Sequence, residues 1–129
     1  MVKIYPLLFV IIAFGCKDES FDRIQTGKWG GEHARLDVNE TSWYVEFDCA
    51  HLEVNQPVLV QDGKFNSPAL YTQEYPVQFD DESLYIPKPS RVFGTVKNKE
   101  MILNVEVEDQ EFGTFTLIYD KEAKIYKCA

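Results

Sequence analysis

The sequence predicts an all-β domain of about eight antiparallel strands, built as a small meander barrel or a closely related sandwich. Aromatic residues make up 14% of the 129-residue chain, and aromatic side chains favour strands. Short stretches of alternating apolar and polar residues follow one another through residues 26–129, which is typical of half-buried strands. Turn-forming residues separate these stretches, and no strong helical period occurs after residue 16. Eight such strands can close into a barrel that is filled by side chains or holds one small ligand.

Four of the predicted strands lie in the first half of the domain. Turn-forming residues separate the first two, and an Asp-Gly pair at residues 62–63 suits the turn before the fourth. The alternation changes phase near residues 49–50, which predicts a bulge or bend before the third strand. The four strands are expected at residues 34–38, 43–47, 52–60 and 65–71.

Residues 72–90 form the least regular stretch, with three prolines and the acidic cluster Asp80-Asp81-Glu82. Loops of this length are often functional or mobile, so this stretch is a candidate lid. Regular alternation returns after it. The remaining strands are expected at residues 91–97, 101–107, 113–119 and 125–128.

The charge balance argues against two classes of partner. The formal net charge is −8, whereas binding to nucleic acid or to an anionic lipid surface needs a basic face. The acidity fits either simple solubility or a basic protein partner. With 45% hydrophobic and 26% charged residues, the composition is that of a globular domain.

Residues 1–15 are predicted to be a signal peptide. Lys3 precedes an apolar run at residues 4–14, which is too short to span a bilayer and has the length of a signal-peptide core. The run ends in A-F-G-C at residues 13–16, which resembles the lipobox of bacterial lipoproteins. The resemblance implies cleavage before Cys16 and acylation of that cysteine. The alternative is an ordinary secretory signal beside an incidental cysteine.

Residues 16–25 are expected to tether the domain to the membrane, and residues 26–129 to form the barrel. The K-D-E sequence at residues 17–19 resembles the surface-export signal of some Gram-negative lipoproteins, and it also fits a plain solvated tether. The expected location is the cell envelope, with the lipid anchor in the outer membrane and the domain on either face.

Cys49 and Cys128 are the two cysteines left once Cys16 carries lipid. In an oxidising compartment an even number of cysteines predicts a disulfide, and closing a loop of roughly 80 residues would stabilise the fold by about 4–5 kcal/mol. A metal site that adds His33 and His51 is the alternative, but these residues show no metal-ligand spacing. We expect no metal and no cofactor.

Two further resemblances concern the domain itself. G-K-W at residues 27–29 precedes the first predicted strand and resembles the G-x-W motif of lipocalin-like barrels, in which the tryptophan closes one end. A longer resemblance, to a family of small bacterial proteins of uncharacterised function, implies no activity and supports pairing Cys49 with Cys128. It is carried by W-G-G-E-H at 29–33, E-F-D-C-A-H at 46–51, G-T-F-T-L at 113–117 and K-C at 127–128.

Two groups of residues are candidates for a site. An aromatic group could line an apolar cup for a small ligand, or it could pack as the core that so small a domain needs. A polar group has the residue types of general acid–base chemistry, or it lies exposed on a hairpin and its bend. The aromatic group is Trp29, Trp43, Phe47, Phe65 and Phe115, and the polar group is His33, Asp48 and His51.

The expected function is therefore a membrane-anchored module that binds a small ligand or a protein at the envelope. An inhibitor or assembly factor that acts on a basic envelope protein is the alternative. An enzyme that uses His33 and His51 is a third interpretation, which requires the two histidines to share one cleft. No nucleophile or phosphate-binding motif occurs, so no catalytic residue is assigned.

Overall fold

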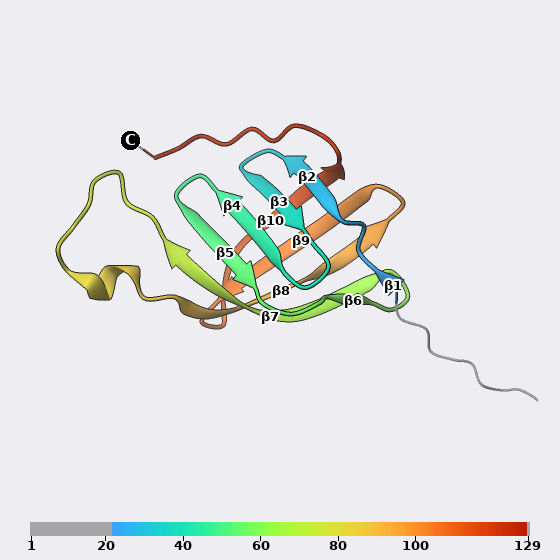
Figure 1. Ribbon diagram of the computed structural model, residues 1–129, viewed down its shortest axis with the longest axis horizontal. Coiled ribbons are helices and arrows are strands. Elements are labelled where there is room, and N and C mark those ends of the chain that lie inside the picture. The colour runs from blue at the N-terminus through green and yellow to red at the C-terminus, as the bar shows by residue number, and fades with distance from the viewer. Residues whose placement is uncertain (1–21, 129) are drawn as a thin grey trace, which may run out of the picture.

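The protein is a closed eight-stranded antiparallel β-barrel (Figure 1), seen in a computed structural model that describes residues 22–128. Each barrel strand pairs with the next one along the chain and the last pairs with the first, in the order β10-β2-β3-β4-β5-β7-β8-β9. The prediction of an all-β meander barrel is confirmed, and closure rules out the sandwich. The barrel strands are β2 (Gly27–Gly31), β3 (Ala34–Val38), β4 (Trp43–Phe47), β5 (Ala50–Val54), β7 (Lys64–Gln73), β8 (Lys88–Lys97), β9 (Glu100–Val107) and β10 (Gln110–Tyr119), and a short 3-10 helix, η1 (Glu82–Tyr85), lies between β7 and β8.

A second, two-stranded sheet attaches the first described residues to one end of the barrel. β1 (Asp22–Arg23) pairs with β6 (Leu59–Val60), and Ile24 is buried in the core. Residues 22–25, which the sequence assigned to the tether, are therefore part of the folded domain. The predicted signal peptide, the lipidation site Cys16 and the rest of the tether lie outside the described residues. Within the described part of the chain, no helix is long and apolar enough to cross a bilayer.

One predicted strand was wrong and one strand of the barrel was missed. The predicted number of eight is therefore correct, although the eight barrel strands are not all the predicted ones. Gly27–Gly31 forms β2, which the pattern did not reveal because two of its five residues are adjacent glycines without side chains to alternate. Residues 125–128 were expected to be the last strand, but β10 is the last strand. Their neighbour Lys124 forms only an isolated bridge with Glu32.

The predicted change of phase is a tight turn and not a bulge. Glu46 pairs with His51 across the antiparallel strands β4 and β5, so the chain reverses at residues 48–49. The third predicted strand is accordingly divided into β5 and the short β6. A bulge does occur elsewhere, in β10 at residues 111–113, where it shapes the site described below.

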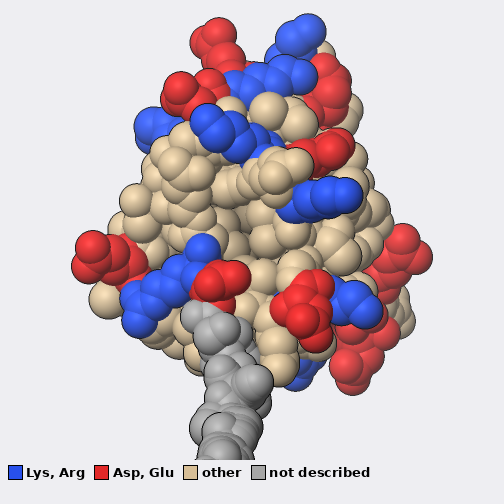
Figure 2. All heavy atoms as spheres, turned by 90° about the vertical axis from the view of Figure 1, so that its right-hand side faces the viewer, with Lys and Arg blue, Asp and Glu red and all other residues tan. Residues whose placement is uncertain are grey.

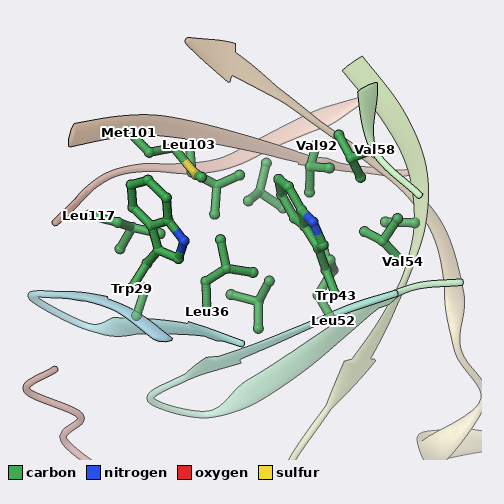
Figure 3. Packing of buried hydrophobic residues seen from close by; sticks show 14 of the residues in the cluster. Trp29, Leu36, Trp43, Leu52, Val54, Val58, Val92, Met101, Leu103 and Leu117 are labelled. Atoms are coloured by element: carbon green, nitrogen blue, oxygen red, sulfur yellow. The ribbon is translucent and has the colours of Figure 1, made fainter. Parts of the chain in front are cut away.

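Apolar side chains fill the middle of the barrel, and Figure 3 shows both tryptophans among them. The indole N–H of Trp29 donates to the Gln25 carbonyl at 3.1 Å, and its ring packs edge-on against Tyr119 with centroids 5.2 Å apart. Trp29 thereby closes the end of the barrel to which β1 is attached. The largest fully buried side chains are Trp29, Leu36, Leu52, Met101, Leu103 and Leu117.

Residues 120–128, here called the C-terminal strap, run across the outside of the barrel (Figure 1). The Lys124 N–H donates to the Gly31 carbonyl at 3.0 Å, and the His33 N–H donates to the Lys124 carbonyl at 2.8 Å. The strap lies directly on Gly30, where an added Cβ would be 2.1 Å from a backbone oxygen of the strap. The W-G-G sequence thus has a packing explanation, because the tryptophan closes the barrel and the following glycine leaves room for the strap.

Charges of both signs are mixed on the end of the molecule that carries β1. Figure 2 views this end, and the Lys and Arg side chains there are interspersed with Asp and Glu. The visible face has no broad area of a single charge sign, so this end offers no strongly charged surface to a partner.

Candidate functional site

A pocket of about 290 Å³ opens at the end of the barrel opposite β1. The β2–β3 turn, the β4–β5 turn, the end of β7 and the start of β10 meet there. Because the middle of the barrel is packed with apolar side chains, this pocket is a cup and not a channel. We call it the aromatic pocket; it is lined by His33, Phe47, Asp48, Cys49, Ala50, Tyr71, Gln73, Phe112 and Phe115.

Four aromatic rings form the wall of the aromatic pocket. The ring centroid of Phe47 lies 5.0 Å from those of both Phe112 and Phe115, and the Tyr71 ring lies 5.1 Å from Phe112. These are the separations of directly packed rings. Phe47 and Tyr71 are buried, whereas Phe112 is 40% exposed. The aromatic wall therefore runs from the core of the barrel to its mouth.

The bulge in β10 explains how Phe112 joins this wall. Phe115 packs against the core and Leu117 is buried, so odd-numbered residues of this strand face inward. Strict alternation would turn Phe112 outward together with Thr114. The shift of register between residues 111 and 113 adds one residue to the strand and allows the Phe112 ring to face inward as well.

His33 and Asp48 meet at the rim of the pocket. His33 Nδ1 lies 2.6 Å from Asp48 Oδ2, and Asp48 Oδ1 accepts a hydrogen bond of 2.8 Å from the backbone N–H of Tyr126 in the strap. The φ of His33 is 70°, a left-handed conformation that costs a residue with a side chain about 1–2 kcal/mol. The bond of its N–H to the strap offsets part of that cost, so the strap helps to hold this rim.

His51 lies outside the aromatic pocket. Its Nδ1 is 2.9 Å from Glu74 Oε2, and its ring stacks on Tyr44 with centroids 5.4 Å apart. It lines a separate hollow together with the end of β7 and the residues that follow this strand. The structure therefore brings His33 and Asp48 together but not His51. Across residues 22–128 the two histidines share no cleft, so the requirement of the enzyme interpretation is not met.

The end of the strap is fixed by a cluster of charges beside His51. Lys127 Nζ lies 2.6 Å from a carboxylate oxygen of Glu46 and 3.4 Å from one of Glu74. The hydrogen bond to Glu46 raises the pKa of Lys127, and the charge of Glu74 adds to the effect. Glu74 thus joins the beginning of the β7–β8 connection to the strap.

Cys49 in the β4–β5 turn and Cys128 in the strap are neighbours. Both are free thiols in this structure, and the hydrogen bond between them raises the pKa of Cys49, with burial adding to the effect. Their proximity is compatible with the predicted disulfide, which stays a prediction. Because Cys49 also lines the aromatic pocket, this pair joins the strap to the pocket wall.

Two of the five aromatic residues predicted to line a cup do so. Phe47 and Phe115 line the aromatic pocket. Trp29, Trp43 and Phe65 do not, and each is at most 4% exposed. Trp43 pairs in register at the far end of β4 and packs edge-on against Phe65 at 5.5 Å. Position along the strands, which residue type does not reveal, separates the core aromatics from the pocket aromatics.

Four lining residues escaped the sequence analysis. Ala50 begins β5. Tyr71 and Gln73 lie at the end of β7, and Phe112 lies at the bulge. The sequence held one signal for Phe112. It is a phenylalanine beside a turn, at a position where alternation along the strand predicts an outward-facing polar residue. The sequence held no comparable signal for Tyr71 or Gln73, because their place at the mouth depends on the pairing of β7 with β5.

Other features of the described residues are weaker candidates. A larger hollow of about 670 Å³ lies on the outer face of β7 and β8. Polar side chains such as Lys64, Asn66 and Asn104 form much of its lining, so it suits an apolar ligand less well. Within residues 22–128, no three or more His, Cys, Asp or Glu side chains gather so as to hold a metal ion.

Comparisons of this chain with family models, with curated proteins and with solved structures found no match. The resemblances to bacterial lipoproteins, to lipocalin-like barrels and to a small uncharacterised family therefore stay predictions. A functional assignment rests on the geometry of the pocket.

Proposed function

We propose that the protein is a lipid-anchored envelope module whose barrel binds one small, mostly apolar ligand in the aromatic pocket. The observation that carries this proposal is the wall of four packed aromatic rings around a hollow of about 290 Å³. Concave sites that are mostly apolar and have a few polar groups are the usual form of a small-molecule site.

The volume of the pocket limits the size of the ligand. About 290 Å³ is roughly twice the ~150 Å³ of an apolar cavity that holds benzene. A ligand with two fused rings, or a branched chain of similar bulk, fits this volume. Covering the exposed 40% of the Phe112 side chain would contribute about 1 kcal/mol, since full burial of a phenylalanine is worth about 1.5–3 kcal/mol.

The polar groups of the pocket limit the charge of the ligand, because they already satisfy one another. The Tyr71 hydroxyl donates to Gln73 Oε1 at 2.8 Å, and Gln73 Nε2 donates to the carbonyls of Cys49 and Glu74 at 3.0 and 3.1 Å. Burial raises the pKa of Tyr71, so its hydroxyl stays neutral near pH 7. A neutral ligand therefore fits best, with polar contacts confined to His33 at the rim.

The entrance of the pocket faces away from the proposed anchor. β1 begins at Asp22 at the closed end of the barrel, and the aromatic pocket opens at the other end. If Cys16 is acylated as the sequence predicts, the chain from the membrane leads to the closed end. The entrance is then free to receive a ligand from the aqueous side.

Fluorescence titration with prodan tests the proposal, because prodan is a neutral naphthalene whose emission moves to shorter wavelength in apolar surroundings. The protein is produced from Lys17 onward without the acyl group, and an unfolding transition verifies that it folds. We expect saturable binding at one site. Phe112→Ser should weaken this binding by about 5- to 30-fold, which corresponds to a loss of about 1–2 kcal/mol.

A matched control separates loss of the pocket from loss of surface hydrophobicity. Phe79 is 43% exposed, close to the 40% of Phe112, and lies outside the aromatic pocket. Phe79→Ser should therefore bind prodan as the unmodified protein does. Equal binding by the unmodified protein and Phe112→Ser, or binding that does not saturate, would contradict the proposal.

A further inference from the structure

We propose that the loop formed by residues 74–87 is a docking surface for a positively charged protein with an apolar cleft. The loop joins β7 to β8 and projects from the barrel, on the side away from β1 (Figure 1). The lid predicted for residues 72–90 stays a prediction: Gln73 of that stretch lines the aromatic pocket, whereas residues 74–87 contribute nothing to its described lining. The docking proposal is therefore independent of ligand binding.

Apolar side chains are unusually exposed on the 74–87 loop. Ile86 is 61% exposed and Val77 is 58% exposed, the two highest values among the large apolar side chains of the described residues. Phe79 adds a third exposed apolar side chain, at 43%. Apolar side chains that gather on the surface, unlike single scattered ones, mark sites of interaction.

Contacts within the loop help to order it. The Tyr75 ring packs edge-on against Phe79 and Tyr85, with centroids 5.4 and 5.6 Å apart. The Phe79 N–H donates to the Tyr85 hydroxyl at 2.8 Å, and the Ser83 N–H donates to the Asp81 side chain at the start of η1 at 3.0 Å. A segment that is already ordered loses less entropy on binding.

Charge of one sign accompanies the exposed apolar side chains. Residues 74–87 contain four acidic residues and no lysine or arginine, and Asp80, Asp81 and Glu82 are exposed. The opposite end of the molecule, seen in Figure 2, mixes charges of both signs. Complementary charge steers association and selects the partner, so the loop fits a basic surface and repels nucleic acid and anionic membranes.

The shape of the loop determines the shape of the partner. A projecting segment buries its apolar side chains only when a concave surface receives them. Val77, Phe79 and Ile86 would enter an apolar cleft, while the acidic side chains contact basic residues around its rim. The loop lies away from β1, so a membrane anchor attached before Asp22 does not obstruct this approach.

Photo-crosslinking of the full-length, membrane-bound protein in the cells that make it tests the docking proposal. A benzophenone amino acid replaces Val77 in one variant and Leu59 in another. Leu59 is 46% exposed in β6, which pairs with β1 away from the loop. We expect a discrete adduct with a basic protein from position 77 and none from position 59. Asp80→Lys with Glu82→Lys should reduce the adduct about tenfold, which corresponds to about 1.4 kcal/mol.

A matched pair of charge changes outside the loop serves as the control. Glu100→Lys with Glu122→Lys makes the same change in net charge at exposed positions and should leave the adduct unchanged. The proposal is overturned if position 77 yields no adduct, an adduct with lipid or with a second copy of this chain, or an adduct that survives the loop charge changes. Phe112→Ser should weaken prodan binding as stated above and leave the adduct intact, so the two proposals can fail separately.

Discussion

Replacing Gly30 with alanine should either strain the C-terminal strap or detach it from the barrel. The added Cβ would lie 2.1 Å from the Lys121 carbonyl oxygen and 2.8 Å from the Ala123 nitrogen, and neither backbone atom can move away as a flexible side chain can. If the strap stays in place, overpacking costs about 1–3 kcal/mol. If it moves away, the two hydrogen bonds through Lys124 are lost, at about 0.5–1.5 kcal/mol each. Either way, we expect Gly30→Ala to lower the free energy of unfolding by about 1–3 kcal/mol.

Urea unfolding measures this loss, and hydrogen exchange at the His33 and Lys124 amides locates it. The control is Gly113→Ala, because the nearest atoms to a Cβ there belong to the Phe115 ring, at 3.1 Å, which can shift slightly. Gly113→Ala should cost much less and leave both amides protected. An unchanged free energy of unfolding in Gly30→Ala, with both amides still protected, would refute the packing role assigned to Gly30.

Three further predictions concern the turn, the loop and the cysteines. Glu108 has a φ of 51°, a left-handed conformation that asparagine adopts more easily than glutamate. Glu108→Asn should therefore raise the free energy of unfolding by about 0.5–1 kcal/mol in the same urea assay. A decrease would contradict this prediction. Hydrogen bonds from the Ser83 hydroxyl and N–H lower the pKa of Asp81. The stability that these bonds contribute is therefore present above the ordinary carboxyl pKa and is lost as the pH falls through the lowered pKa of Asp81. NMR titration should show that Ser83→Ala raises the pKa of Asp81. The protein from the envelope should have an intact mass lower by two hydrogens than with free Cys49 and Cys128, and Cys128→Ser should cost about 4–5 kcal/mol; an unchanged mass would exclude the disulfide.

The barrel could be predicted from the sequence because its strands are buried on one face only. Residues 101–107 show this most clearly, since Met101, Leu103 and Val105 are buried and the residues between them are not. Side-chain alternation is a local property, so it appears in a single sequence without knowledge of the partner strands. β2 was missed for the same reason, because Gly30 and Gly31 contribute no side chain to an alternating pattern.

The site could be predicted only in part because it depends on contacts between distant segments. Asp48 was grouped with His33 from residue type, and the structure places the two 2.6 Å apart. The partner of His51 is Glu74, 23 residues away, and alternation in a sequence does not identify such a pair. Phe112 reaches the pocket through a bulge whose position depends on pairing between β9 and β10.

The most direct test of the proposed ligand site is an amide chemical-shift map of the isotopically labelled protein as prodan is added. Binding in the aromatic pocket predicts that the largest changes occur at Ala50, Phe112 and Phe115, which line it from β5 and β10. The largest changes at Asn66 and Phe93, in the hollow on the outer face of β7 and β8, would contradict the assignment of the site. So would a complete absence of changes at saturating prodan.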